Sequence, residues 1–427
     1  MWSQTDIRMV MTTTMEQRVI LHSDLNCFYA SVEMMLNPSL RGKAVAVCGS
    51  TESRHGIVLA KSELAKKRGV KTGMVNWEAR QCCPDIIMVP PQYDEYLKYS
   101  KLTRAIYERY TDQVEGFGMD ECWCDVSGSR TMFGDGMTIA EKIRQTVKAE
   151  LGLTVSIGVS FNKIFAKLGS NLKKPDAITG ISADNFKEKI WPLPASDLLY
   201  VGRATTKKFD SYGIRTIGDI ANTSQDFLKR LLGVNGLALW TYANGLDSSR
   251  VMPENYESPV KSVGHGITCS ADLDNNEEVW KVMLELSQDI GHRLRLHSLT
   301  ARGVQIMIRD NDLYFKQFQA PLESQSQSPM EIARKARQLF EANYRWTSKV
   351  RAITVRAISL IPADTPYQIS IFEDTAKRER REKLDTAVEE IRGRFGKRAI
   401  YSACLMGNLK MPSDGREKVV MPGMMYQ

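Results

Sequence analysis

Three acidic residues in two places give this 427-residue sequence its clearest chemical signal. Asp24 ends an apolar stretch that predicts a buried strand, and Asp120 and Glu121 lie near the turn of a predicted hairpin. Carboxylates at strand ends of a mixed sheet can converge on Mg²⁺, which prefers a few carboxylates together with substrate phosphates. Two such ions about 3.5–4 Å apart stabilise the attacking and leaving oxygens of a phosphoryl transfer. On these residues alone, two other interpretations stay open: Asp24 as a helix N-cap and Asp120–Glu121 as a solvated turn.

Short strands and helices over residues 18–180 must position these acids, and they predict a mixed unit of the α/β or α+β type. The strands are expected at 18–24, 43–48, 56–59 and 155–160, with a hairpin at 113–126. The helices are expected at 26–36, 61–68, 96–110, 138–151 and 163–172.

The strand pattern disappears between residues 181 and 246, where short helical patterns dominate, and a polar stretch with Pro253 and Pro259 is typical of a linker. Beyond it the order of elements is β-α-β-β-α-β, which predicts a compact split-βαβ unit. Residues 366–427 form a tail with a charged helix. In the split unit, strands are expected at 262–269, 303–309, 313–320 and 352–360, and helices at 277–296 and 329–343.

The composition limits the class of protein. The 58 Lys and Arg residues outnumber the 50 Asp and Glu and give a net charge of +8, which suits a polyanionic partner but also many metabolic enzymes. No apolar run approaches the roughly 20 residues that span a bilayer, and the first fourteen residues lack the apolar core of a signal peptide. Eight cysteines are too sparse for a disulfide scaffold and lack zinc-site spacing. We therefore expect a cytoplasmic protein with reduced thiols and no membrane partner.

Three stretches carry a resemblance to a known family. Residues 22–33 (HSDLNCFYASVE) resemble the opening motif of the Y-family DNA polymerases, the translesion enzymes. Residues 118–126 (GMDECWCDV) resemble their second carboxylate motif, and residues 155–175 (VSIGVSFNKIFAKLGSNLKKP) resemble a third, long and specific one. The order and spacing also fit, and the similarity extends from about residue 18 to residue 410. The flanking segments look closer to UmuC-like and Gram-positive relatives than to standard DNA polymerase IV.

The resemblance implies an α+β fold arranged as a right hand, with palm, fingers, a helical thumb and a split-βαβ little finger. Its implied partners are primer–template DNA, a deoxynucleoside triphosphate (dNTP) and the sliding clamp, and we expect a monomer. Whether an accessory repair protein takes part, as in UmuC-like relatives, stays open. The implied boundaries are palm 17–25 and 93–181, fingers 26–92, thumb 182–247, linker 248–258, little finger 259–365 and tail 366–427.

The implied reaction is template-directed, low-fidelity DNA synthesis across damaged template, or translesion synthesis, which makes the enzyme a mutator. Asp24, Asp120 and Glu121 match the family's catalytic carboxylates, and with the backbone carbonyl of Leu25 they match its ligands for two Mg²⁺ ions. No segment suggests an exonuclease, so proofreading is not expected.

Two other classes of protein are alternatives to a polymerase. The first is an inactive DNA- and clamp-binding protein, but such a protein would not need all three acids. The second is a cyclase-like palm enzyme, which would not need a DNA-binding hairpin or a clamp peptide.

Positive charge and backbone donors are expected around the triphosphate. The amides of Cys27 and Phe28, at the start of a helix, are candidate donors to the β- and γ-phosphates. Lys174 matches the family's phosphate-binding lysine, Lys66 stands where relatives usually carry arginine, and Glu63 stands where they carry a phosphate-binding tyrosine. An acid beside a triphosphate is unfavourable, so we expect Glu63 to point away or the local alignment to shift. For Lys66 a solvated helix face remains the alternative.

Tyr29 matches the family's steric gate, an aromatic ring that fills the space a ribose 2′-hydroxyl needs. Because a clash discriminates without attraction, one side chain is enough to exclude ribonucleotides. On composition alone, a core aromatic in an apolar helix is the simpler interpretation, and it is the motif that favours the gate.

Two regions are expected to contact the DNA backbone. Residues 199–220 resemble a helix-hairpin-helix, whose turn amides grip phosphate without reading sequence. Its candidates are Gly202, Arg203 and Lys207, although Ala204 replaces the usual second glycine and a plain αα-hairpin remains the alternative. The little-finger candidates, which are also readable as ordinary surface arginines, are Arg302, Arg309, Arg351 and Arg356.

Residues 368–372 (QISIF) resemble the pentapeptide by which bacterial polymerases bind the sliding clamp. Gln368 is the expected anchor, and Ile371 and Phe372 are the pair expected to enter an apolar pocket. The alternative is that this pair packs back on the little finger.

Overall fold

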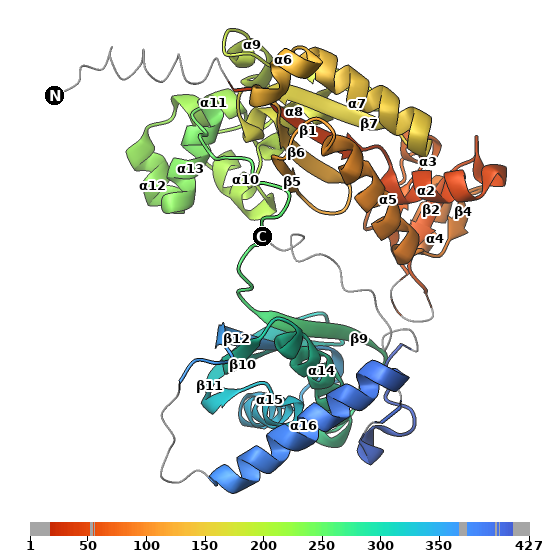
Figure 1. Cartoon of the computed structure of the whole chain (residues 1–427), viewed down its shortest axis with the longest axis vertical. Helices are drawn as coiled ribbons and strands as arrows, with labels where there is room; N and C mark the ends of the chain where they lie inside the picture. The colour runs from red at the N-terminus through yellow and green to blue at the C-terminus, as the bar shows by residue number, and fades with distance from the viewer. Residues whose placement is uncertain are drawn as a thin grey trace. The chain divides into compact units, whose positions relative to one another are not determined.

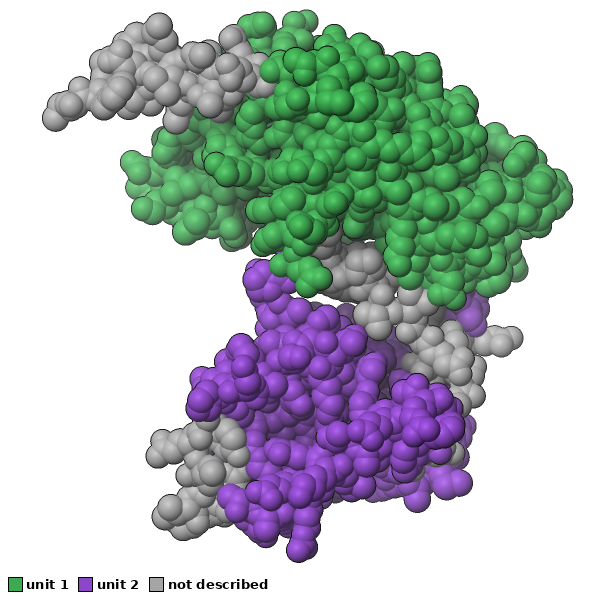
Figure 2. Space-filling model, in the orientation of Figure 1, with its two compact units in different colours: residues 1–48, 57–257, 419–427 green, residues 49–56, 258–418 purple. Residues whose placement is uncertain are grey.

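The computed structural model describes residues 18–51, 54, 56–366, 374–397, 399–400 and 402–412. Among these described residues, 18–48 and 57–257 form one compact unit, and 49–51, 54, 56 and those from 258 to 412 form a second (Figure 2). Helices and strands are mixed in both units, as the sequence predicts, and the fold class is α+β (Figure 1).

A five-stranded sheet in the first unit carries the three acids. Its order is β5-β6-β1-β7-β8, and the central strand β1 (Ile20–Leu25) is antiparallel to both β6 (Glu121–Asp125) and β7 (Val155–Ser160). β5 (Val114–Gly116) completes the predicted hairpin with β6. The short β8 (Ile178–Gly180), which the sequence pattern does not predict, lies parallel to β7.

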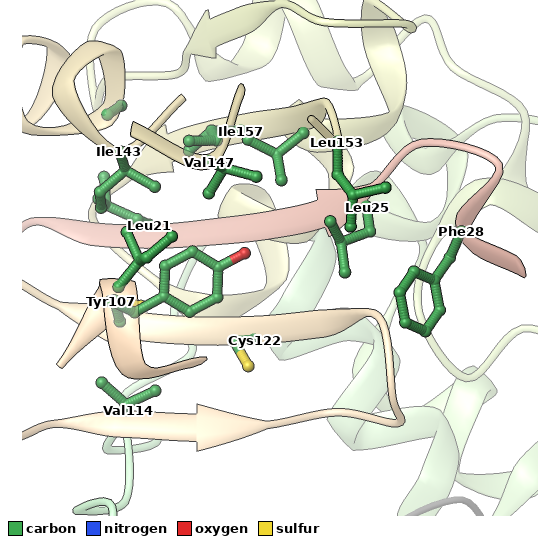
Figure 3. Close-up of a cluster of buried hydrophobic side chains, with 14 of the residues drawn as sticks. Leu21, Leu25, Phe28, Tyr107, Val114, Cys122, Ile143, Val147, Leu153 and Ile157 are labelled. Carbon is green, nitrogen blue, oxygen red and sulfur yellow. The ribbon is translucent and has the colours of Figure 1, made fainter. Parts of the chain in front are cut away.

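Alternation along β1 divides its side chains between the two faces of this sheet. The helices that pack near it are α5 (Tyr93–Tyr107), α7 (Gly136–Leu151) and α8 (Lys163–Leu172). Leu21 and Leu25 point into the main hydrophobic core, to which α5 and α7 contribute (Figure 3). Ile20 packs on the opposite face with residues of α8 and β6. His22 and Asp24 share the face of Ile20, and the periodicity of the strand therefore directs both toward α8.

A glycine lets α8 pack close to the sheet. A Cβ atom on Gly158 of β7 would lie 1.9 Å from the carbonyl oxygen of Ala166 and 2.6 Å from the amide nitrogen of Ser170, so no larger residue fits there. The side chain of Asn162 caps the helix by accepting a hydrogen bond from the amide of Phe165. This close packing brings the polar residues of α8 within reach of β1.

A second, three-stranded sheet has the order β3-β2-β4. β2 (Val45–Cys48) is antiparallel to β3 (Val58–Lys61) and parallel to β4 (Ile87–Val89), a strand that the sequence pattern does not predict. The helices of this region are α2 (Phe28–Leu36), α3 (Glu63–Lys67) and α4 (Asn76–Cys82), with the short turn η1 (Pro38–Leu40).

The helix predicted at 61–68 begins later than expected. Lys61 ends β3, and Ser62 is the N-cap of α3, with its hydroxyl accepting a hydrogen bond from the amide of Ala65. An N-cap residue has non-helical backbone, so the basic run is divided between a strand and a helix.

The region predicted to lack strands is helical. Its buried side chains, among them Phe209 and Leu228, form a core cluster with residues of α8. Its helices are α9 (Phe186–Ile190), α10 (Arg203–Asp210), α11 (Ile217–Asn222), α12 (Gln225–Leu232) and α13 (Val234–Ala243), with η3 (Ala195–Asp197); two shorter turns, η2 (Ser127–Ser129) and α6 (Arg130–Phe133), follow β6.

The second unit confirms the predicted β-α-β-β-α-β order. Its antiparallel sheet has the order β11-β10-β12-β9, and two long helices share a core with one face. The strands are longer than expected, because their polar and exposed ends do not differ in sequence from loops. The elements are β9 (Val263–Leu273), α14 (Asn276–Leu296), β10 (Leu299–Asp310), β11 (Phe315–Ser326), α15 (Pro329–Asn343) and β12 (Val350–Pro362).

The charged helix predicted in the tail is α16 (Thr375–Phe395), which joins the second unit through polar contacts. Arg381 pairs with Glu331 of α15, and Asp385 pairs with Arg295 of α14. The turn η4 (Ala403–Leu405) adds an apolar side chain to a small cluster on the same two helices. Among the described residues, no helix has the length and apolar character that crossing a membrane requires.

Candidate active site

Strands β1 and β6 bring the three predicted acids together. Asp24 stands directly opposite Glu121 in the register of these antiparallel strands, so the two side chains emerge on the same face. Asp120 precedes Glu121, and its carbonyl oxygen accepts a hydrogen bond of 2.9 Å from the amide of Leu25. The interpretation of Asp24 as an N-cap is wrong, because Asp24 lies within β1 and Cys27 is the N-cap of α2.

The three carboxylates repel one another in a poorly solvated place. Burial raises the pKa of Asp24 to about 7 against the opposing effect of Lys174, and the charges of Glu121 and Asp120 add to the rise. Burial and the charge of Glu121 raise the pKa of Asp120 to about 6. The protein therefore compensates the negative charges of Asp24 and Asp120 incompletely. Against the effect of burial, His22 and Lys167 lower the pKa of Glu121 to about 2. Such a cluster of perturbed carboxylates is typical of functional sites.

Two lysines face these acids. The ammonium group of Lys174 donates to Asp24 Oδ2 at 2.7 Å, and that of Lys167 pairs with Glu121 Oε2. In the part of the chain that the structure describes, no three His, Cys, Asp or Glu side chains gather closely enough to hold a metal ion as they stand. The donor chemistry nevertheless fits a hard cation such as Mg²⁺, because carboxylate oxygens short of positive charge are its preferred protein ligands.

The side chain of Glu63 lies beside the start of α2. Cys27 caps this helix in a left-handed backbone conformation (φ 51°), and its thiol donates to Glu63 Oε1 at 3.1 Å. The ammonium group of Lys66 lies 3.6 Å from the same oxygen. Glu63 therefore has its own counter-charge. Phe28, the first residue of α2, has an amide that cannot take part in the hydrogen bonds within the helix.

Tyr29 is half-buried beside the acids. Its ring stacks on Tyr96 with the centroids 4.2 Å apart, and its hydroxyl donates to Met119 Sδ at 3.4 Å. Burial, together with the charge of Asp120 and the proximity of Tyr93, raises the pKa of the Tyr29 hydroxyl to about 12. The ring is thus held in one orientation next to the carboxylate cluster.

The predicted DNA-binding residues are exposed on their respective units. Gly202 is the N-cap of α10, and Arg203 and Lys207 are exposed on that helix. In the second unit, Arg309 and Arg356 alternate with core residues of β10 and β12, so they lie on the sheet face away from α14 and α15. Basic side chains at exposed positions are suited to contacts with phosphate.

Comparisons with known proteins identify the family of this chain. The model of the impB/mucB/samB family matches residues 23–171, and the model of its C-terminal domain matches residues 260–371. This chain belongs to the impB/mucB/samB family. It is a bacterial Y-family polymerase, a DNA-directed DNA polymerase, as the three motifs predicted.

Relatives of this Y-family polymerase are similar over almost their whole length. DNA polymerase IV of Acetivibrio thermocellus is 51% identical over 390 residues, which are 91% of this chain and 98% of the relative. DNA polymerase IV 1 of the Gram-positive Bacillus subtilis is 35% identical over 404 residues, 94% of this chain and 96% of the relative. A solved Y-family DNA polymerase chimera aligns with a TM-score of 0.71 at 23% identity, over 81% of this chain and 99% of its own, and confirms the fold class.

Two residues that contact Glu121, His22 and Lys167, do not stand out from the motifs. His22 precedes Asp24 by two residues, so strand periodicity places both on one face. Lys167 and Ser170 are three residues apart on α8 and therefore share a helix face. This periodicity is the only signal in the sequence, because the contact between the two faces depends on how closely α8 approaches the sheet.

Proposed function

We propose that this polymerase carries out translesion DNA synthesis by two-metal nucleotidyl transfer, with Asp24, Asp120 and Glu121 as its catalytic carboxylates. The observation that carries the proposal is the register of β1 and β6, in which Asp24 stands opposite Glu121 and beside Asp120. These carboxylates and the carbonyl group of Leu25 would hold the two Mg²⁺ ions. When bound, such ions lower the pKa of the primer 3′-hydroxyl and neutralise the leaving pyrophosphate.

The residues around the acids suit a triphosphate. The side chain of Lys174 is 24% exposed, so its ammonium group can exchange Asp24 for a phosphate oxygen. At the start of α2, the amides of Cys27 and Phe28 and the helix dipole favour an anion. Lys66 would add a positive charge at the same helix end. The ion pair between Lys66 and Glu63 reduces the repulsion that an acid would otherwise exert there.

The remaining elements fit the hand-shaped organisation of the family. The five-stranded sheet belongs to the proposed palm, and the β3-β2-β4 sheet belongs to the proposed fingers. Gly202, Arg203 and Lys207 in the thumb, and Arg309 and Arg356 in the little finger, would bind the DNA backbone, which makes affinity fall steeply with salt. The proposed boundaries are palm 17–25 and 93–181, fingers 26–92, thumb 182–247, linker 248–258, little finger 259–365 and tail 366–427.

We infer that the enzyme works without proofreading and with low fidelity, as a cytoplasmic monomer. The strands and helices that the structure describes in its proposed fingers are short, which suits an open site around the nascent base pair. The two acid motifs expected for synthesis are present in the sequence. No other segment of the sequence suggests an exonuclease.

Primer extension with and without a divalent cation tests the proposed function. With Mg²⁺, we expect extension on an undamaged template and insertion opposite a template lesion such as an abasic site. Chelation of the cation by EDTA should stop both, and excess Mg²⁺ should restore both. Excision of a mismatched primer terminus should not be detectable. Extension that persists in EDTA would contradict the two-metal proposal, whereas a complete stop at every lesion would contradict the translesion role.

A separate prediction concerns the clamp motif, whose residues Gln368, Ile371 and Phe372 lie outside the described residues. Deletion of residues 368–372 should abolish the stimulation of synthesis by the host sliding clamp, because an apolar anchor pair typically contributes most of such peptide binding. Basal extension without the clamp should not change. The measurement is processive extension of a primed circular template with and without loaded clamp. Equal loss of basal and stimulated synthesis would reject the clamp role.

A further inference from the structure

The two oxygens of the Glu121 carboxylate have different surroundings. Oε2 pairs with the ammonium group of Lys167 and lies 3.4 Å from His22 Nε2. Within the described ranges, no hydrogen bond or ion pair engages Oε1. The carboxylate is therefore held through one oxygen only, and the other oxygen is available to a ligand.

The side chain of Lys167 is largely buried and packed against its neighbours. Its side chain is only 14% exposed, and its ammonium group lies 4.6 Å from the centroid of the Phe117 ring. The amide of Phe117 in turn donates to the carbonyl oxygen of Glu121 at 2.8 Å. Lys167, Phe117 and Glu121 thus form one packed group, in which the lysine has little freedom to move.

His22 is the second group beside Glu121 Oε2. Its Nδ1 lies 2.8 Å from the hydroxyl of Ser170, which donates to the carbonyl oxygen of Lys167 at 2.8 Å. The ring of His22 is fully buried, and its Nε2 has no hydrogen-bond partner among the described residues. The ion pair with Lys167 is therefore the contact that fixes Oε2 of Glu121.

We propose that Lys167 is a positioning residue for the polymerase reaction, which holds Glu121 by Oε2 and leaves Oε1 as the oxygen that binds a divalent cation. This inference rests on the proposed role of Glu121 as a metal ligand. A carboxylate that is held through one oxygen keeps its other oxygen in the orientation that the reaction needs. Outer partners that orient a ligand in this way typically change metal affinity or activity by about 10- to 100-fold when they are replaced.

A positioning role predicts an effect different from that of a lost ligand. Replacing Lys167 with methionine removes a positive charge beside three carboxylates, so the attraction of the site for a cation should not weaken. The orientation of Glu121 is lost, however, and the rate of insertion should fall by about 10- to 100-fold. The loss of a true ligand would instead weaken cation binding and insertion together.

The test compares Lys167→Met with Lys167→Arg, which keeps the charge, and with Lys163→Met as a matched control. Lys163 lies one turn earlier on α8. Like Lys167, it pairs with an acid, Glu115 at 2.6 Å, and lies over an aromatic ring, that of Trp123. Lys167→Gln is a second variant with a polar side chain, in case methionine disturbs folding at this position.

Mn²⁺ binding to the full-length enzyme with primer–template DNA is followed by electron paramagnetic resonance, and single-nucleotide insertion is measured at saturating dNTP. The inference predicts Mn²⁺ affinity at or above that of the wild type, slower insertion in Lys167→Met and Lys167→Gln, recovery in Lys167→Arg and no change in Lys163→Met. Normal insertion in both neutral variants would overturn it, as would Mn²⁺ affinity that falls together with rate. If Asp24→Asn remains active, it is the proposed function that has failed.

Discussion

Replacement of Asp24 by asparagine is expected to slow primer extension by about a thousandfold. This corresponds to about 4 kcal/mol of transition-state stabilisation, the order of several kcal/mol that a divalent cation supplies to phosphoryl transfer. Asparagine has nearly the same shape and can still accept a hydrogen bond from Lys174, so the backbone register of β1 should persist. The change therefore removes charge from the cluster and little else.

Thermal stability distinguishes this loss of chemistry from a loss of fold. The pKa of Asp24 is about 7, above its ordinary value, so the charged carboxylate is less stable in the folded protein than in the unfolded chain. In the absence of metal, ionisation of Asp24 therefore lowers the free energy of unfolding progressively as the pH rises from about 4 to 7. The Asp24→Asn variant has no ionisable group at this position and should not lose this stability. At pH 8 in EDTA, the variant should melt no lower than the wild type.

A second carboxylate of the same sheet provides the control for Asp24→Asn. Asp125 ends β6, stands opposite Ile20 and accepts hydrogen bonds from the amide and hydroxyl of Ser127. Asp125→Asn should leave single-nucleotide insertion unchanged, with DNA affinity by fluorescence anisotropy equal for both variants and the wild type. If Asp24→Asn inserts nucleotides at a normal rate, the three acids are not the catalytic carboxylates.

The elements that hold the acids were predictable from the sequence because their pattern is dictated by burial. β1 is central in its sheet and buried on both faces, and its apolar residues up to Leu21 indicate a buried strand that leads to Asp24. The hairpin of β5 and β6 turns at a glycine with positive φ, Gly118, which places Asp120 just before β6 and Glu121 at its first position. Local signals of this kind are enough to locate the carboxylates.

Contacts between distant segments were not predictable in the same way. β4 and β8 are three-residue strands whose pairing is parallel, and so short a segment has no readable alternation. The side chains of Glu63 and Cys27 meet only because α3 follows a strand that packs beside α2. Lys167 reaches Glu121 only because Gly158 lets α8 approach the sheet. In each case the sequence contains the residue, but tertiary packing decides its partner.

Tyr29→Ala is expected to reduce the discrimination against ribonucleotides by about 30- to 160-fold. Forcing extra atoms into a filled space costs about 2 to 3 kcal/mol, and this is the penalty that the ring would impose on a ribose 2′-hydroxyl. The stacking of Tyr29 on Tyr96 and the hydroxyl contact with Met119 hold the ring in place, so it cannot yield to the larger sugar. Alanine removes the ring, and the ribonucleotide should then be inserted nearly as well as the deoxynucleotide.

The conservative variant Tyr29→Phe distinguishes the effect of the ring on sugar selectivity from the effect of the hydroxyl group. It loses only the hydrogen bond to Met119 and keeps the stacked ring, so it should keep most of the sugar selectivity. Because Tyr29 supplies none of the three carboxylates, both variants should retain the Mg²⁺ dependence of the wild type. Single-nucleotide insertion with paired deoxy- and ribonucleotides measures all of these effects. Unchanged selectivity in Tyr29→Ala would mean that the ring is an ordinary core aromatic, and that the exclusion of the 2′-hydroxyl comes from another part of the site.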